Sequence, residues 1–315
     1  MKTVVRTPSR IHLGLLDVKG GLKRMYGGVG VALNEPYTIV EVSDSPEFKV
    51  ESGDERAEMY ALRIKERFGI NGGLRIRVLE HIPPHVGLGS GTQLALGIGY
   101  AMTKHLGMEI SPEDLAKVLG RGRRSGVGIY SFKLGGFLVD GGVGNDDIPV
   151  LVMRYDFPQD WLFVVGIPNI ERGFYGKREE DLLRKLTERL NERNECICET
   201  FRVLILEMIP ALIRRDIVGF GEAITRFEIE VGRVFSHVQG DVFRSPVIGK
   251  GIEFLLENGA YGAGQSSWGP AFYGLVDEDN SDKLLKKLRE FLREHGGGDS
   301  FIARANNSGA QVMTS

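Results

Sequence analysis

The sequence predicts an α+β protein built of two domains. Segments with alternating or β-branched apolar residues, which are typical of strands, are concentrated in the first half of the chain. Segments with apolar residues at helical spacing dominate the second half. The change in composition falls near residue 160, so we expect a first domain over 1–160 and a second over 161–315. Strands and helices that are segregated in this way define the α+β class.

Composition and charge narrow the classes of function. The 315 residues are 42% hydrophobic and 26% charged, which is typical of a globular protein that needs no metal or disulfide to hold its core. With a net charge of −2 and no long basic run, we expect no nucleic-acid partner, although small anionic substrates remain open. Arg6 and Pro8 interrupt any signal peptide and Glu207 lies in the longest apolar stretch, so we expect a cytoplasmic protein without a membrane partner. We expect Cys196 and Cys198 to be reduced thiols, because a metal site would need more ligands nearby.

Local patterns place the elements of the first half in order. Residues 3–18 mix β-branched and alternating apolar residues and predict a strand that is broken at Pro8. Residues 54–69 carry apolar residues at helical spacing and end in glycine, which predicts a helix. Strands are expected over 28–42 and 72–83, on either side of this helix.

A capping pattern and further periodic segments give the remaining elements. Ser111 precedes Pro112 and two acidic residues, as an N-cap precedes a first helical turn, so a helix begins there. The other expected strands are a pair over 129–142, two over 148–168, and one each over 271–278 and 300–312. The other expected helices cover 92–107, 176–195, 251–260 and 281–297, the last with Ser281 as its cap, and further helices run to about residue 235.

A glycine-rich loop at 83–96, with the sequence PPHVGLGSGTQLAL, is the strongest candidate for a ligand site. It follows a strand and precedes a buried helix, whose N-terminus offers unpaired N–H groups and the positive end of the helix dipole to an anion. Glycines let the backbone approach a ligand closely. The phosphate-binding candidates are Gly87, Leu88, Gly89, Ser90, Gly91, Thr92 and Gln93. The loop is neither a Walker A motif nor a dinucleotide fingerprint, and a plain turn before a buried helix is the alternative.

This loop resembles the phosphate loop of the GHMP kinase superfamily, which includes galactokinase and the homoserine, mevalonate and phosphomevalonate kinases. TPSRIHLGLLD at 7–17 resembles the superfamily's N-terminal strand motif, and GAYGAGQSSWGPAFYGLV at 259–276 resembles its C-terminal glycine-rich motif. The three matches occur in the right order and span nearly the whole chain. The resemblance implies an N-terminal domain like domain 2 of ribosomal protein S5 and a ferredoxin-like C-terminal domain.

Two positions depart from the pattern of the kinases. RGRRSGVGIYS at 121–131 matches the stretch that supplies the kinases' catalytic aspartate, but Gly128 stands at that position. Lys117 stands where the kinases carry a magnesium-binding glutamate, if the alignment has no gap. Phosphoryl transfer needs a group that orients the acceptor hydroxyl and ligands for the metal. The sequence therefore favours the phosphate-binding scaffold without kinase chemistry, unless the register is shifted and another acid serves.

One branch of the superfamily fits these departures, the β-ribofuranosylaminobenzene 5′-phosphate synthases of methanopterin biosynthesis. PSRIHLGLLD, GLGSGTQLAL, GRGRRSGVG, GGFLVDGG and SSWGP resemble the motifs of that family, in order. The resemblance implies a glycosyltransferase, an archaeal source and a homodimer. Its reaction joins 5-phosphoribosyl-1-pyrophosphate to 4-aminobenzoate or 4-hydroxybenzoate, with release of carbon dioxide and pyrophosphate. A departing pyrophosphate also calls for Mg²⁺ as a cofactor. An ATP-dependent small-molecule kinase and an inactive ligand-binding protein are the alternatives.

An arginine cluster is the second candidate for binding an anionic substrate. Arg121, Arg123 and Arg124 lie next to Ser125, with glycines on both sides. Arginine binds phosphate or carboxylate through two parallel hydrogen bonds, so we expect these four residues to bind substrate. The alternative is a solvated helix end, where cations complement the helix dipole.

The first strand and the loop after it carry candidates for catalysis. Arg10 and His12 are two residues apart and share one face of the strand. The acceptor attacks as a carbanion-like ring carbon, and a base would help if the ring carries a phenol. We take Arg10, His12 and Asp17 as the catalytic candidates, with Asp140 as a further base. A histidine satisfied in the core of the protein is the alternative for His12.

The C-terminal motif replaces the glycine run of the kinases with polar side chains and a tryptophan. These are Gln265, Ser266, Ser267 and Trp268. We expect them to bind the sugar phosphate and to stack the benzoate on the indole. The alternative is that Trp268 packs between the domains. His237 and Gln239 are expected in a solvated loop.

Overall fold

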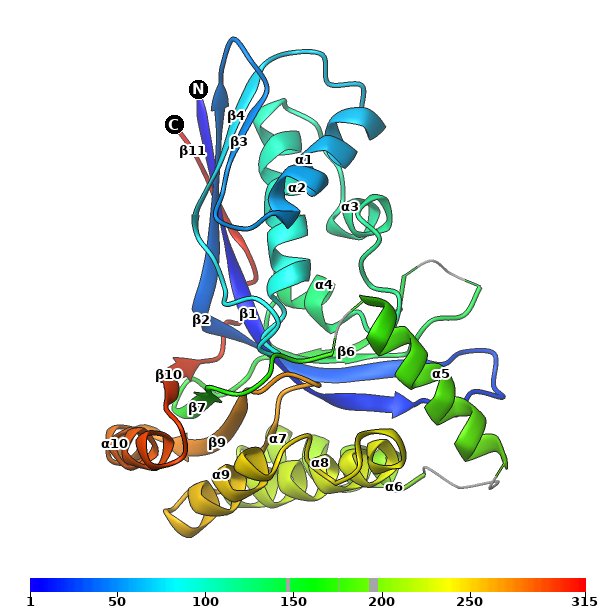
Figure 1. Ribbon diagram of the computed structural model, residues 1–315, viewed down its shortest axis with the longest axis vertical. Coiled ribbons are helices and arrows are strands. Elements are labelled where there is room, and N and C mark those ends of the chain that lie inside the picture. Colours follow the sequence, from blue (N-terminus) through cyan, green and yellow to red (C-terminus); the bar gives the residue numbers. More distant parts are fainter. Residues whose placement is uncertain (146–147, 175, 193–197) are drawn as a thin grey trace.

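Two sheets organise the chain in the computed structural model, which describes residues 1–145, 148–174, 176–192 and 198–315 (Figure 1). The first sheet has the strand order β11-β1-β2-β4-β3, with β5 beside β2 and β6 beside β5. Its strands are β1 (Lys2–Asp17), β2 (Tyr26–Asp44), β3 (Lys49–Glu51), β4 (Leu74–Glu80), β5 (Phe137–Asp140), β6 (Leu151–Tyr155) and β11 (Gln311–Thr314). Its pairs are antiparallel except for β3 with β4.

Four helices cover one face of the first sheet (Figure 1). They are α1 (Arg56–Arg67), α2 (Ser90–His105), α3 (Pro112–Val118) and α4 (Val127–Lys133). The helix expected over 54–69 is confirmed by α1, and the buried helix expected over 92–107 is confirmed by α2. Ser111 is the predicted N-cap of α3, since its hydroxyl accepts a 3.0 Å hydrogen bond from the N–H of Asp114.

The second sheet has the strand order β10-β7-β9-β8 and is wholly antiparallel. Its strands are β7 (Trp161–Pro168), β8 (Gly262–Gln265), β9 (Phe272–Asp277) and β10 (Gly298–Arg304). In chain order this is fourth, first, third, second, which is the ferredoxin-like arrangement that the resemblance implies. The helices of this half are α5 (Gly176–Glu192), α6 (Cys198–Val203), the π-helix η1 (Leu204–Met208), α7 (Ile209–Arg214), α8 (Ile217–Gln239), α9 (Pro246–Glu257) and α10 (Glu278–Glu294).

The two ends of the chain meet in the first sheet, where β11 pairs with β1 (Figure 1). The N–H of Lys2 donates to the carbonyl of Ser315 at 2.8 Å, and the N–H of Ser315 donates back at 2.9 Å. The boundary expected near residue 160 falls between β6 and β7, and the last strand returns across it to the first sheet. No described helix combines the length and the apolar character needed to cross a lipid bilayer.

The strand pair expected over 129–142 is wrong in its first half, where the chain forms α4. Aromatic and β-branched residues favour a strand there, but tertiary contacts override that preference. Ile129 and Phe132, three residues apart, bury their side chains in the same core as α2. The side chain of Gln93 also donates to the carbonyl of Gly128 at 2.8 Å and so holds the start of the helix.

Three smaller expectations are also corrected. Helix α10 begins at Glu278 with Asp277 as its N-cap, so Ser281 lies inside the helix, where its hydroxyl donates to the carbonyl of Glu278. The single strand expected over 300–312 is two strands, β10 and β11, which belong to different sheets. Cys198 is disulfide-bonded rather than reduced, and Cys196 lies outside the described residues.

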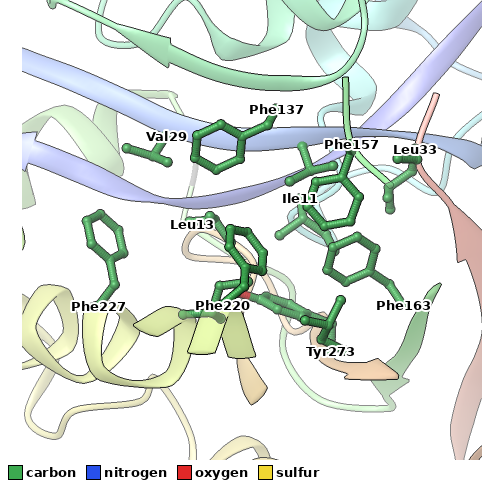
Figure 2. Packing of buried hydrophobic residues seen from close by; sticks show 14 of the residues in the cluster. Ile11, Leu13, Val29, Leu33, Phe137, Phe157, Phe163, Phe220, Phe227 and Tyr273 are labelled. Atoms are coloured by element: carbon green, nitrogen blue, oxygen red, sulfur yellow. The ribbon is translucent and has the colours of Figure 1, made fainter. Parts of the chain in front are cut away.

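One hydrophobic core joins the two domains (Figure 2). Ile11 and Leu13 of β1 contribute to it from the first sheet. Phe220 of α8, Phe163 of β7 and Tyr273 of β9 contribute from the second domain. Because these rings pack against the face of β1, the geometry of β1 relative to α8 and β8 is fixed by close packing.

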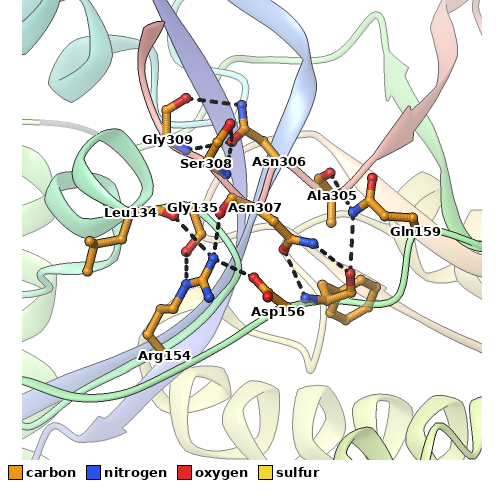
Figure 3. Close-up of polar contacts among 11 residues, drawn as sticks. Leu134, Gly135, Arg154, Asp156, Gln159, Ala305, Asn306, Asn307, Ser308 and Gly309 are labelled. Atoms are coloured by element: carbon orange, nitrogen blue, oxygen red, sulfur yellow. Dashed lines mark hydrogen bonds and ion pairs between the residues drawn. The ribbon is translucent and has the colours of Figure 1, made fainter.

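The connection from β10 to β11 pins the domains together through side-chain amides (Figure 3). Asn307 accepts from the N–H of Phe157 and donates to its carbonyl, both at 2.9 Å. Arg154 donates to the carbonyls of Leu134 and Asn307. Thus one asparagine satisfies both main-chain groups of a buried residue.

Asn307→Ala is expected to lower the free energy of unfolding by about 1–3 kcal/mol, because it leaves the main-chain groups of buried Phe157 without these partners. Urea denaturation followed by circular dichroism measures this difference. The matched control is Asn71→Ala at an exposed site, which is expected to change stability by less than about 0.5 kcal/mol. Equal stabilities of the two variants would contradict the assigned role of Asn307.

Candidate active site

Strand β1 places two polar side chains beside the glycine loop. Arg10 donates from its main-chain N–H to the carbonyl of Leu88 at 3.2 Å, and its guanidinium donates to the carbonyl of Gly87. His12 follows on the same side of the strand, because alternate residues of a strand share one face. Both side chains line a single cavity of about 500 Å³. The strand thus positions the two catalytic candidates at one wall of a common space.

The glycine loop can take its course only with glycine at two positions. Gly87 has φ +98°, and a Cβ there would lie 2.2 Å from the carbonyl oxygen of Ser266. Gly89 has φ +86° and is the N-cap of α2. The first helical hydrogen bond runs from the N–H of Thr92 to the carbonyl of Gly89 at 3.1 Å. The N–H groups of Ser90 and Gly91 come before this bond in the chain. These groups stand at the positive end of the helix dipole, on the cavity wall.

The C-terminal motif closes on both the strand and the loop. The hydroxyl of Ser266 accepts from the N–H of His12 at 3.0 Å and donates to the carbonyl of Gly87 at 2.7 Å. The N–H of Ser267 donates to the carbonyl of His12 at 2.9 Å. The side-chain amide of Gln265 donates to the carbonyls of Ser267 and Gly269, each at 3.0 Å. Three segments far apart in sequence therefore form one hydrogen-bonded unit.

One end of the cavity is strongly cationic. Gly91 lies between two guanidinium groups, since a Cβ there would be 3.1 Å from nitrogens of Arg56 and Arg121. Arg121 donates twice to the hydroxyl of Thr92, at 3.2 Å each. Arg56 pairs with Asp54 at 2.6 Å. Several positive groups therefore surround the first turn of α2, which is the arrangement that binds a polyanion.

Arg10 and His12 are both affected by their surroundings at this end. Burial lowers the pKa of Arg10 to about 10, with Glu179 opposing and Arg121 adding to the effect, so the guanidinium stays charged. Its Nε is buried without a hydrogen-bond partner in the described part of the chain. Burial and the neighbouring Arg10 lower the pKa of His12 to about 3, so its imidazole is neutral near pH 7. The cavity therefore offers a fixed cation next to an uncharged ring.

The rest of the arginine cluster faces the start of α5. Arg124 pairs with Glu179 at 2.6 Å and with Glu180 at 3.5 Å. Arg123 is largely exposed and reaches Glu180 only at 4.0 Å. Since Glu179 and Glu180 line the cavity as well, this end of α5 forms part of its wall.

Asp140 fixes the residues that directly follow the arginine cluster. Its carboxylate accepts from the hydroxyl of Ser125 at 3.0 Å, and from the N–H groups of Gly126 at 2.8 Å and Gly142 at 3.0 Å. Burial raises the pKa of Asp140, and these hydrogen bonds oppose the rise. Asp140 is 1% exposed and does not line the cavity, so it positions Ser125 and does not reach a ligand.

The other end of the cavity is aromatic. The indole of Trp268 packs edge-to-face against Phe235, with ring centroids 4.9 Å apart, and against Phe174, with centroids 5.6 Å apart. Its N–H donates to the side-chain carbonyl of Gln239 at 2.7 Å. Gln239 is the last residue of α8, so the solvated loop expected around it is wrong. Since all four residues line the cavity, this end suits a flat apolar ring.

A buried acid also lines the aromatic end. Glu228 of α8 accepts from the hydroxyl of Tyr273 at 2.7 Å. Burial raises the pKa of Glu228 well above its usual range, although Tyr273 and the main chain of Gln265 favour the charged form. No motif in the sequence predicts a role for this residue.

The structure brings most of the predicted residues to this cavity. Those that line it are Arg10, His12, Gly87, Gly89, Ser90, Gly91, Thr92, Arg121, Arg123, Arg124, Ser125, Gln265, Ser267 and Trp268. Four predicted residues are placed elsewhere. Asp17 caps a turn by accepting from Lys19 and Gly20, and Leu88 is buried in the shared core. The side chain of Gln93 donates to the carbonyl of Gly128. The hydroxyl of Ser266 makes its hydrogen bonds to the main chain of β1 and of the glycine loop.

The lining includes residues that the sequence analysis missed. These are chiefly Arg56, His85, Phe174, Glu179, Glu180, Glu228 and Phe235. Arg56 and Glu179 read as ordinary charges on the surfaces of helices, and only the fold turns them toward the site. Glu228 did leave a signal, because it interrupts an apolar helix face between Ile224 and Phe235.

The side chains of the cavity offer few ligands to a metal ion unless a phosphate is bound there as well. Within the described residues, no group of three or more histidine, cysteine, aspartate or glutamate side chains is arranged to hold a metal ion. Magnesium, however, often uses one or two carboxylates and takes its other oxygens from phosphates and water. Glu179 and Glu180 are carboxylates at the cationic end that fit such a shared site.

Of the two positions that depart from the kinases, Gly128 adjoins the site and Lys117 does not. A Cβ on Gly128 would lie 3.1 Å from Cγ2 of Thr92 and 3.4 Å from its Oγ1, so an acid there would adjoin the glycine loop. Lys117 lies on α3 and is not part of the cavity lining.

The fold and the anion-binding loop together define a protein of the GHMP kinase superfamily. Residues 56–136 match the N-terminal domain of GHMP kinases, and residues 208–294 match their C-terminal domain. The β-ribofuranosylphenol 5′-phosphate synthase of Methanothermobacter thermautotrophicus is 33% identical over 99% of this chain and 99% of its own length. The synthase of Archaeoglobus fulgidus is 33% identical over 98% of both chains. This chain therefore belongs to the family of the β-ribofuranosylphenol 5′-phosphate synthases.

Solved structures share the fold at low sequence identity. A mevalonate diphosphate decarboxylase from Staphylococcus aureus has a TM-score of 0.70 at 16% identity and covers 99% of this chain and 98% of its own. A putative homoserine kinase from Listeria monocytogenes has a TM-score of 0.65 at 18% identity and covers 99% and 100%. Both confirm the predicted GHMP architecture.

Arg121→Gln is expected to weaken the binding of pyrophosphate, in the presence of Mg²⁺, by roughly 10- to 100-fold, because it removes a charged donor beside the first turn of α2. Isothermal titration calorimetry measures the affinity. Arg67→Gln removes one charge at an exposed site outside the cavity and serves as the control. If the two variants bind pyrophosphate equally well, the cationic end is not where the anion binds.

The lowered pKa of His12 makes stability depend on pH. Below pH 6.5 an unfolded histidine takes up a proton, whereas the folded His12 does so only near pH 3, so the folded state loses stability as the pH falls through this window. Between pH 7.5 and 5, the ligand-free protein is expected to lose about 2 kcal/mol more than His12→Gln. Urea denaturation at each pH measures this, with exposed His81→Gln as the control that keeps the steeper dependence. Parallel curves for the protein and His12→Gln would refute the assignment.

Proposed function

We propose that this protein transfers the ribose 5-phosphate group of 5-phosphoribosyl-1-pyrophosphate to a para-substituted benzoate and releases carbon dioxide and pyrophosphate, as a step of methanopterin biosynthesis. The observation that carries this is the single cavity with a cationic end and an aromatic end. The relatives' names describe a ribofuranosylphenol product, which is what 4-hydroxybenzoate yields on losing its carboxylate. We therefore place 4-hydroxybenzoate first among the acceptors and 4-aminobenzoate second.

The cationic end stabilises the leaving group. As the bond between ribose C1 and pyrophosphate breaks, negative charge grows on pyrophosphate and positive charge on the sugar. Donors that are already oriented toward the departing oxygens lower this barrier without reorganising. Arg10, Arg56 and Arg121, with the N–H groups at the start of α2, are the donors in place.

Magnesium belongs to the same end of the cavity. We propose that Glu179 and Glu180 hold Mg²⁺ together with the pyrophosphate oxygens, where it would add positive charge against the leaving group. Arg124 now pairs with both carboxylates and would turn to a substrate phosphate once the metal is bound.

We assign His12 to binding the ribose of the donor, between the cationic and the aromatic end of the cavity. Its ring is neutral and cannot compete with the arginines for pyrophosphate, but it can accept a hydrogen bond from a ribose hydroxyl. The main chain of His12 is fixed by Ser266 and Ser267, so the point from which the ring extends into the cavity is fixed. Both constraints favour a positioning contact with the donor.

The aromatic end orders the acceptor. The rings of Trp268, Phe174 and Phe235 offer edges and faces for a benzoate, and they exclude water from it. The ring carbon that carries the carboxylate forms the new C–C bond to ribose C1. The bond to the carboxylate then breaks, its electron pair restores the aromatic ring, and carbon dioxide leaves.

Two other functions remain as outcomes of the test. An ATP-dependent kinase is disfavoured because Gly128 adjoins the loop where a catalytic acid would be needed. A ligand-binding protein without turnover would bind phosphoribosyl pyrophosphate and release nothing. The homodimer and the cytoplasmic location stay expectations that do not affect this chemistry.

The decisive experiment mixes the protein with Mg²⁺, phosphoribosyl pyrophosphate and carboxyl-labelled 4-hydroxybenzoate or 4-aminobenzoate. Labelled carbon dioxide and pyrophosphate are expected in equal amounts, with both substrates required and ATP not required. Omission of each substrate in turn supplies the controls. Release of neither product, with tight binding of the donor, would establish the ligand-binding protein instead, and ATP turnover with any acceptor would establish the kinase.

A further inference from the structure

A buried carboxyl group lines the cavity on the same side as its aromatic residues. Glu228 shares one face of α8 with Val231, Phe235 and Gln239, at the three- and four-residue spacing of a helix, and all of them line the cavity. Gly14 of β1 packs directly against this face of α8, since a Cβ there would lie 2.6 Å from Val231. Gly14 is four residues beyond Arg10, which is about 13 Å along a strand.

The second sheet is shaped around this carboxyl group. A Cβ on Gly264 of β8 would lie 2.4 Å from Cγ of Glu228 and 2.7 Å from its Oε1, so a glycine is needed beside it. Tyr273 of β9 donates to Oε1 at 2.7 Å, and the main chain of Gln265 bonds the same carboxyl group. A buried acid with such provision costs stability if it only fills space, since an apolar side chain would pack there without partners.

The chemistry of the acceptor matches this position. The carbon that attacks the ribose carries the carboxylate and must face the cationic end, where the donor binds. The para substituent lies on the opposite side of the ring and therefore points away from the cations. In this cavity that direction leads to the aromatic end and to Glu228.

We infer that Glu228 binds the phenolic hydroxyl of 4-hydroxybenzoate and acts as the general base for the reaction, with Tyr273 as its positioning residue; this rests on the proposed function. Glu228 accepts the phenolic proton as the ring carbon attacks ribose C1 and the C1–O bond to pyrophosphate breaks, with its electron pair leaving on pyrophosphate. When carbon dioxide departs, the electrons of its bond restore the ring and the phenolate, which takes the proton back. The proton is thus borrowed and returned, and no other reactant is needed.

The electrostatics of the site agree with this role. Burial raises the pKa of Glu228 well above its usual range, which makes the carboxylate a stronger base, and the hydrogen bonds from Tyr273 and the main chain of Gln265 oppose the rise by stabilising the charged form. Tyr273 is the titratable side chain that bonds Glu228, and the facing residues of β8 and β1, Gly264, Gln265 and Gly14, carry no charge. A phenol without a base is a weak carbon nucleophile, whereas phenolate is a strong one.

Glu228→Gln keeps the shape of the side chain and removes the base. With 4-hydroxybenzoate, kcat/KM is expected to fall by about 100-fold or more. With 4-aminobenzoate the fall is expected to stay under about 10-fold, because the aniline nitrogen pushes electrons without losing a proton. The more acidic phenol 3-fluoro-4-hydroxybenzoate is expected to recover part of the lost rate. Equal losses with all three acceptors, or no loss, would overturn the inference.

Tyr273→Phe tests the same idea through pH. Removal of the hydroxyl raises the pKa of Glu228, so the acidic limb of kcat/KM with 4-hydroxybenzoate is expected to move to higher pH. Tyr261→Phe is the matched control, because it removes a hydroxyl that bonds Asp277 outside the cavity, and it is expected to leave the limb in place. If the acidic limb does not move in Tyr273→Phe, Glu228 is not the general base. This result would decide the question even if Glu228→Gln failed to fold. Absence of turnover in the unaltered protein would instead reject the proposed function itself.

Discussion

One serine hydroxyl holds the candidate site together. Ser266 accepts from the N–H of His12 and donates to the carbonyl of Gly87, so it joins β1, the glycine loop and the C-terminal motif in one place. The contact is possible because Gly87 has no side chain, since a Cβ there would meet the carbonyl of Ser266 at 2.2 Å. Three motifs that are separated by most of the chain are thus fixed relative to one another by hydrogen bonds of ordinary length. The positions of Arg10 and of the loop that leads into α2, which line the cationic end, depend on this junction.

The two ends of the cavity owe their different character to the two domains. The first domain supplies the start of α2 and the guanidinium groups of Arg56 and Arg121, which together attract an anion. The second domain supplies Trp268 and Phe235, whose rings gain nothing from an anion but pack well against another ring. Because a single core joins the domains, the two kinds of wall stay at a fixed separation. A substrate pair with one highly charged partner and one aromatic partner fits this division.

Those features of the fold that depend on local hydrogen bonding and residue spacing could be predicted from the sequence. Ser111 as an N-cap, the buried helix after the glycine loop and the role of glycine in the loop all depend on a few neighbouring residues, and each was predictable. The helix at Val127–Lys133 was not, because its residues favour a strand and only the contact with Gln93 and burial against α2 select the helix. Arg56 was missed for a related reason, since a charge on the surface of a helix does not show which residues distant in sequence pack around it.

The replacement of an acid by Gly128 gains a physical meaning from its position. A side chain there would lie against Thr92, whose hydroxyl accepts two hydrogen bonds from Arg121. An aspartate would bring a negative charge next to this guanidinium and would draw it away from a bound pyrophosphate. A kinase tolerates that charge because the acid orients a hydroxyl that attacks the phosphorus. In a reaction where the pyrophosphate must leave intact, the same acid would oppose the growing negative charge, so the glycine favours departure of the whole group over transfer of one phosphoryl unit.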